Sequence, residues 1–155
     1  MRTKENKVWF QTGSVSTAQS ETSFPFFIAS SDDPTEANTR HKLTEDLYLI
    51  AFRTQVRSAG TFVLDVTVRK DGVDTAITQN FPSGASGLRD NGAFPPILFR
   101  AGEYISLRAV GQAGSGTFTN EYQMVFSRTP DSEIHNNNRI GSRVRPAAFS
   151  PGHAR

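Results

Sequence analysis

The sequence predicts an all-β protein, an antiparallel two-sheet β-sandwich of the jelly-roll kind with extended N- and C-terminal arms. Three observations lead to this fold class. Apolar and polar residues alternate with a period of two in several segments, as in half-buried strands. Turn-forming residues separate these segments at hairpin-like spacing, which fits about eight short strands. No long segment has helical periodicity, which argues against a β-α-β architecture.

The clearest alternation covers residues 61–69, where one face carries Phe, Leu, Val and Val. Residues 117–126 and 104–109 alternate in the same way. Residues 47–52 are apolar on both faces, which is typical of a central strand. Shorter strands are expected at residues 7–11, 22–29, 74–81 and 94–99. Proline within the second and last of these favours an edge or a bend.

The connections between the predicted strands contain recognisable turns. Asp71-Gly72 is the pair that a type I′ hairpin turn favours. The glycines of residues 111–116 join two alternating runs, so they are hairpin residues and not a phosphate-binding loop. Asp33-Pro34-Thr35-Glu36 offers an N-cap, a proline at the first helical position and a glutamate that can reach back. A short exposed helical turn or a polar loop is expected there.

Length and composition restrict the protein class. A chain of 155 residues fits one domain with its own core. The absence of cysteine excludes disulfides, thiolate catalysis and cysteine-bound metals. The charged N-terminal residues lead into no apolar run, which argues against a signal peptide. No segment has the roughly 18 apolar residues of a membrane span, so we expect a product made in a cytoplasm with no membrane partner.

The charge distribution divides the chain. We expect a sandwich over residues 1–127, with an N-terminal arm at about residues 1–20, and an extended basic tail over residues 128–155. The tail holds five arginines and two acidic residues, hence a charge of +3. The rest is then near −1, because the whole chain carries +2.

Motifs for catalysis or metal binding are not found in the sequence. His41, His135 and His153 lack the spacing of a zinc site. The acidic groups at residues 32–36 and 71–74 do not match a calcium loop. No G-x-S-x-G motif is present. Glu45, Glu103 and Glu121 could meet across a sheet as paired acids, but solvated strand faces are the simpler explanation. We therefore expect no cofactor, no metal and no enzymatic activity.

Candidate interface residues lie near both ends of the chain. Trp9, beside Phe10, is the single tryptophan, and a core or interface position is favoured over an exposed carbohydrate platform. The tail is too polar to form a core, so it is either disordered or held on a partner surface. In the second case apolar anchors such as Phe149 would bind the partner, and Arg139, Arg143 and Arg145 would pair with acidic groups. Nucleic acid is the less favoured partner, because no aromatic residues are interleaved with the arginines.

Two segments carry a resemblance to a known class of proteins. Residues 58–78, with the strand ending Arg69-Lys70-Asp71-Gly72 and the threonine-containing partner strand, resemble a pattern of bacteriophage virion proteins. Residues 99–109, followed by a Gly/Ser hairpin and a closing strand, resemble the same proteins. Phage decoration, tail and fibre proteins with jelly-roll or related sandwich folds are similar, as are, more distantly, trimeric C1q- and tumour-necrosis-factor-like domains. The resemblance covers about residues 45–127 and carries over no catalytic residue.

This resemblance implies a structural role and a homotrimer. The expected function is that of a capsid decoration or cement protein on the virion surface, assembled in the host cytoplasm, with the major capsid protein or other virion proteins as partners. A tail, collar or fibre-associated virion protein shares every feature of the sequence. A carbohydrate-binding or host-recognition module is the alternative from another class, and it predicts exposed aromatic residues in a groove between loops.

Overall fold

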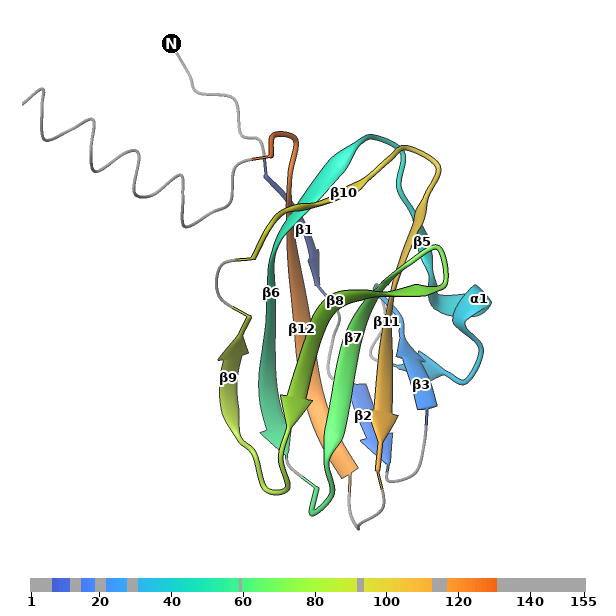
Figure 1. The fold of residues 1–155 in the computed structure, drawn as a ribbon. Helices are drawn as coiled ribbons and strands as arrows, with labels where there is room; N and C mark the ends of the chain where they lie inside the picture. The colour runs from blue at the N-terminus through green and yellow to red at the C-terminus, as the bar shows by residue number, and fades with distance from the viewer. Residues whose placement is uncertain are drawn as a thin grey trace, which may run out of the picture.

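Two antiparallel sheets packed face to face make up the protein (Figure 1). The computed structural model describes residues 7–11, 15–18, 22–27, 31–58, 60–91, 94–112 and 117–130. The all-β fold class and the two-sheet sandwich are therefore confirmed. Within the described residues the helical content is one turn, α1 (Glu36–Thr39), and no helix there has the length and apolar character to cross a bilayer.

Sheet A has the order β1-β12-β6-β10, with β2 also paired to β12 and β9 also paired to β6. Its strands are β1 (Lys7–Gln11), β2 (Val15–Ala18), β6 (Leu47–Ser58), β9 (Gly87–Asp90), β10 (Ile97–Phe99) and β12 (Thr117–Ser127). The two longest strands, β6 and β12, lie side by side at its centre.

Sheet B has the order β4-β3-β11-β7-β8, with β5 also paired to β11. Its strands are β3 (Thr22–Pro25), β4 (Asp32–Asp33), β5 (His41–Lys42), β7 (Leu64–Lys70), β8 (Val73–Phe81) and β11 (Tyr104–Gly111). Most neighbours in either sheet are distant in the sequence, because the chain crosses repeatedly from one sheet to the other.

The core lies between the sheets and is rich in phenylalanine. The alternating residues predicted to share a face are buried together, among them Phe62, Leu64, Val66 and Val68 of the β7 segment. Phe118 packs edge-on against Phe62, with ring centroids 5.0 Å apart. Aromatic pairs in this geometry add about 1 kcal/mol to the stabilisation that burial provides.

The predicted strands are all present, with different ends. The strand expected at residues 22–29 is described as residues 22–25 and lies between β4 and β11, with Pro25 as its last residue. The strand expected at residues 94–99 begins at Ile97, after Pro95 and Pro96. Four short strands, β2, β4, β5 and β9, were not predicted, because segments of two to four residues carry no measurable periodicity.

The helical turn was predicted near the correct place but with the wrong cap. Thr35 is the N-cap of α1, and its side chain makes no capping hydrogen bond. Asp33 instead accepts hydrogen bonds from the Thr35 backbone N–H and from Asn38. Glu36 does not reach back to the cap, because its carboxylate lies against sheet B.

The Asp71-Gly72 turn connects β7 and β8 as predicted. Both residues have positive φ, 48° at Asp71 and 79° at Gly72, as a type I′ turn requires. A methyl group at Gly72 would meet Glu36 at an ordinary van der Waals distance of 3.7 Å, so backbone conformation is the main constraint there.

We expect Gly72→Ala to lower the free energy of unfolding by about 1 kcal/mol, because alanine disfavours positive φ. Gly72→Asn is the matched control and should lose less, since asparagine tolerates the left-handed region. Urea denaturation of the two variants measures the difference. Equal losses would show that space and not backbone conformation limits this position.

An aromatic cluster connects β1 of sheet A with β5 of sheet B. The ring of Phe10 lies 4.8 Å from that of His41 in β5 and 5.3 Å from that of Phe126 in β12. Phe27 contacts both Phe10 and His41. Partial burial in this cluster lowers the pKa of His41 from its ordinary value of 6.5, because desolvation disfavours the imidazolium ion.

Stability should therefore fall in mildly acidic solution. The folded state binds the His41 proton less tightly than the unfolded state does. Protonation therefore favours unfolding, and the free energy of unfolding decreases as the pH falls below 6.5. His41→Phe keeps a ring and removes the titration. Thermal unfolding between about pH 7.5 and 5 should show a flatter profile for this variant than for the native chain.

Candidate interaction surface

The outer face of sheet A is the candidate interaction surface. Its residues come from β6 and β12, at the positions that alternate with the core residues of these strands. Leu49 and Phe52 of β6 point into the core, and a register shift between β6 and β12 lets Ile50 and Ala51 both lie outside it.

A small second apolar cluster marks one end of this face. Ile50, Ala51 and Val125 form it, and half-buried Tyr48 packs against them. The exposure of the first three is below 5%. Apolar packing therefore occurs on both sides of β6, as the sequence of residues 47–52 predicts for a central strand.

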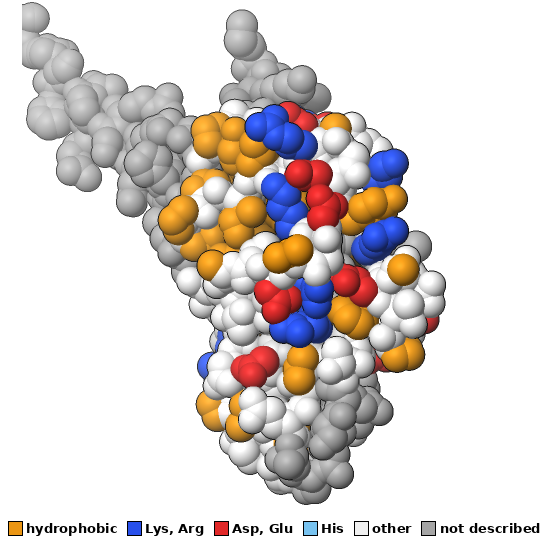
Figure 2. Space-filling model, turned by 45° about the vertical axis from the view of Figure 1, so that its right-hand side comes forward, with side chains coloured by type: hydrophobic (Ala, Val, Ile, Leu, Met, Phe, Trp, Pro, Cys, Tyr) orange, Lys and Arg blue, Asp and Glu red, His pale blue; other side chains and the backbone are white. Residues whose placement is uncertain are grey.

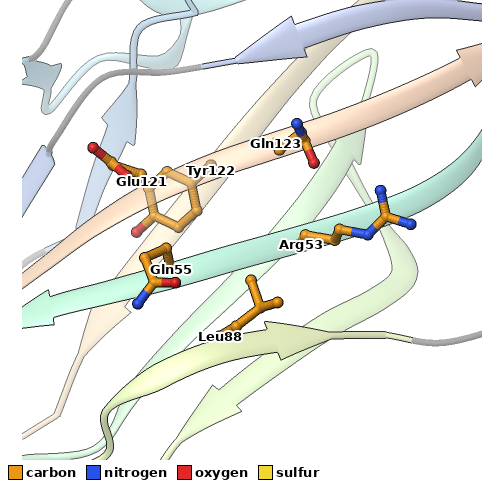
Figure 3. A pocket seen from close by; sticks show the side chains of 6 residues that line it. All are labelled: Arg53, Gln55, Leu88, Glu121, Tyr122 and Gln123. Carbon is orange, nitrogen blue, oxygen red and sulfur yellow. The ribbon is translucent and has the colours of Figure 1, made fainter.

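A shallow hollow continues the same face toward the edge of the sheet (Figure 3). Its volume is about 130 Å³, and it is lined by Arg53, Gln55, Leu88, Glu121, Tyr122 and Gln123. Leu88 of β9 is 66% exposed beside the side chains of β6 and β12. Leu88 and the polar side chains around it make this hollow the candidate contact site of the face.

The charges around this hollow balance. Arg53 Nε lies 2.9 Å from Asp90, and Arg57 lies 2.6 Å from Glu121. The pairs are partly exposed, so each is worth little by itself. Among the described residues around the hollow, two cations and two anions thus leave no excess of like charge to repel another copy.

On the outer face of sheet B, basic and acidic side chains lie next to one another, with hydrophobic side chains beside them (Figure 2). Arg69 of β7 lies 3.0 Å from Glu36 of α1 and 3.4 Å from Asp74 of β8. Asp74 also binds Arg108 of β11 at 2.5 Å. The four charges cancel and join four elements across the sheet.

Further contacts hold the α1 segment on this face. Ser106 of β11 donates a hydrogen bond to Glu36 Oε1. The guanidinium of Arg40 lies 4.0 Å from the ring centroid of Tyr104, a distance at which the cation is attracted to the ring face. The Tyr104 backbone N–H donates to Asp71 in the β7–β8 turn. These contacts pair Glu36, Arg40, Asp71 and Ser106 with partners within the subunit.

Buried polar groups join the two sheets. Gln79 of β8 accepts a hydrogen bond from Thr54 of β6 and donates to the Phe52 carbonyl. Asn120 donates to the Tyr122 hydroxyl at 3.1 Å. Complete burial raises the pKa of Tyr122 far above its ordinary value, so the phenol stays neutral and serves as a packing group.

The acidic candidates do not come together. Glu45 pairs with Arg128, Glu103 with Lys70, and Glu121 with Arg57. The Arg100 backbone N–H is the main cause of a lowered pKa at Glu103, and Lys70 adds to it. Among the described residues no three His, Asp or Glu side chains gather as metal ligands. Of the acidic groups compared with a calcium loop, Asp33 and Asp71 accept hydrogen bonds from backbone N–H groups, and Asp74 pairs with Arg108.

The structure describes only some of the predicted interface residues. Trp9 lies on β1, where its backbone pairs with that of Val125, and its side chain falls outside the described residues. Phe10 is half-buried against the core cluster. Arg139, Arg143, Arg145 and Phe149 lie outside the described residues, as does all of 131–155. Their interface role stays a prediction.

Sequence reasoning missed Leu88 and its neighbours. Leu88 belongs to the unpredicted strand β9, in a stretch of the sequence that reads as a long turn. In the sequence, the single indication of this strand is one leucine among Gly, Ser and Asp residues. A single apolar residue in a loop is common on protein surfaces, so this signal has no weight before β9 is seen beside β6.

No protein-family model matches this sequence, and no curated protein matches it.

We expect Glu36→Gln to lower the free energy of unfolding by about 1 kcal/mol, because it weakens charge-assisted bonds to a guanidinium that is mostly buried. Glu45→Gln is the control, since its partner Arg128 is exposed, and it should leave stability unchanged. Chemical denaturation at low and high salt measures both. Equal effects would mean that the α1 segment contributes nothing through Glu36.

Proposed function

We propose that this protein is a structural component of a bacteriophage virion, a homotrimeric decoration or cement protein that binds the capsid surface. The observation that carries the proposal is the contrast between the two outer faces. The described charges are paired within the subunit on both faces, but on sheet A they surround a hollow with exposed Leu88. A charge-balanced face with an exposed apolar side chain suits a contact in an assembly.

The positions of the segments that resemble phage virion proteins support this proposal. Residues 58–78 contain β7 and most of β8, and residues 99–109 contain most of β11. These strands are neighbours in sheet B. The strand-turn-strand pattern and the later strand therefore belong to one folded unit, as they would in a virion sandwich domain.

The strand order supports the finer fold assignment. We infer a jelly roll, because the chain passes back and forth between sheets and places β12 between β1 and β6, and β11 between β3 and β7. Such interleaving is what two Greek keys produce in a double-sheet jelly roll. Related trimeric domains use this fold, so the homotrimer belongs to the same proposal.

The mechanism of a cement protein is mass action. A protein that binds the assembled shell and not its free subunits shifts the equilibrium toward the shell. In this proposal the outer face of sheet A joins the copies, and the basic residues 128–155 bind acidic groups of the capsid. Affinity then depends on several weak contacts made at once by one trimer.

Binding to capsids tests the function directly. Purified protein should cosediment with undecorated capsids and raise their melting temperature, because the ligand stabilises the state that it binds. Deletion of residues 129–155 should abolish binding and leave the circular dichroism of the sandwich unchanged. Labelling of the particle in electron microscopy would distinguish a capsid position from a tail, collar or fibre position. Protein that leaves capsid melting unchanged would contradict the proposal.

Leu88→Asp should weaken self-association by at least about tenfold, because it puts a charge into an apolar contact. Val73→Asp is the matched control, since Val73 is the other large apolar side chain that is exposed among the described residues, at 68%. Analytical ultracentrifugation measures the trimer–monomer equilibrium of both. A trimer unaffected by Leu88→Asp would remove this face from the contact.

A further inference from the structure

The open edge of sheet B offers a second, separate contact. β8 pairs with β7 along one side, and among the described strands none pairs with its other side. The backbone N–H and C=O groups along such an edge can accept another strand. This edge is distinct from the outer face of sheet A.

β8 lacks several of the features that protect edge strands, and its one register irregularity lies in its first half. With nine residues, it is the longest of the described strands that lie at a sheet edge. β4 has two residues and is followed by Pro34, and β10 has three and follows Pro95 and Pro96. Shortness, proline and lysine are common means of preventing edge-to-edge pairing. The sequence of β8 contains no proline, lysine or arginine, and Asp74 is its single charge.

The C-terminal half of β8 is regular and accessible. Its register against Leu64 to Thr67 is unbroken, and the irregularity lies before it, between Thr67 and Arg69 on β7. A hollow of about 200 Å³ lies between this half and β9, lined by Thr78, Gln79, Asn80, Arg89, Asp90 and Asn91. Gln79 bridges it by donating to the Arg89 carbonyl at 3.5 Å, and the Arg89 guanidinium lies 5.2 Å from the Phe81 ring centroid, so β9 contacts the inner side of β8 and not its edge. The two exposed residues of this half, Thr78 and Asn80, alternate with buried ones.

The sequence of this half is compatible with pairing to a second copy, because none of its five residues is charged and its alternation is kept when the segment is reversed. Ile77 and Phe81 are apolar and buried, Thr78 and Asn80 are neutral and polar, and Gln79 lies at the centre. When the segment is reversed about Gln79, apolar residues stay opposite apolar ones and polar residues stay opposite polar ones. Matched cross-strand pairs of this kind stabilise antiparallel sheets.

We propose that residues 77–81 of β8 pair antiparallel with the same residues of a second copy, about a two-fold axis at Gln79. Ile77 then faces Phe81 of the second copy, and Thr78 faces Asn80 of the second copy. The two Asp74 residues lie about 34 Å apart along the pair, so like charges do not meet. The contact is isologous and joins two B sheets into one continuous sheet.

The contact goes beyond the proposed function, because it joins copies without a capsid and without the outer face of sheet A. A pair of five-residue strands buries far less than the roughly 1,200 Å² of a stable interface, so it is weak between isolated subunits. It becomes effective where many copies are held side by side. In an array, it would link each subunit to one in the next oligomer.

Register-specific cross-linking tests the pairing, and the chain helps because it has no cysteine of its own. Thr78→Cys and Asn80→Cys chains with different tags are mixed under mild oxidation. The mixed disulfide should form at least about fivefold faster than either same-site disulfide, because directly opposite Cβ atoms lie closer than diagonal ones. Thr44→Cys, an exposed position outside β8, gives the rate of random collision. Equal rates for all pairs would overturn the proposal.

A charge exchange tests the same register without cysteine. Thr78→Lys with Asn80→Lys puts like charges opposite each other across the pair, and Thr78→Glu with Asn80→Lys puts opposite charges there. Sedimentation equilibrium should show at least about a tenfold weaker association for the first double variant than for the second. Circular dichroism establishes that both are folded. Equal association of the two would also overturn the pairing, whatever the result with capsids.

Discussion

Burial of a phenylalanine-rich layer between the sheets is the constraint on which the rest of the structure depends. Nine-tenths or more of each core side chain is hidden, and aromatic pairs such as Phe62–Phe118 and Phe99–Phe126 cross from strand to strand. A strand has two faces, so a sequence that commits one face to this layer leaves the other for solvent or partners. The outer faces and the edges are therefore the places where function can reside.

The outer face of sheet A and the edge of β8 are two separate contact regions. Sheet B pairs Glu36, Arg69, Asp74 and Arg108 with one another. Sheet A carries the exposed leucine and the hollow. The edge of β8 adds directional backbone groups. A face contact and an edge contact lie in different directions, and two such contacts are what an extended array on a surface requires.

Much of the fold follows from local patterns, and the failures have local causes. The alternation of residues 61–69 and 117–126 predicts their buried faces, and Asp71-Gly72 predicts its turn, because each signal lies within a few residues. β9 was missed since four residues form a strand there only through pairing with β6. The cap of α1 was misassigned because Glu36 has stronger partners than the helix start, Arg69 and Ser106, far away in the sequence.

The sequence by itself determined the fold class, the strand faces and the hairpin turn, because periodicity and turn chemistry act between near neighbours. The tertiary structure alone decided which outer-face side chains meet. Glu36 and Ser106 are 70 residues apart, and Thr54 and Gln79 are 25 apart. Their contacts depend on the order of strands in the sheets, which a local pattern does not encode. For the same reason, Leu88 and the open edge of β8 became candidates only when their neighbours were known.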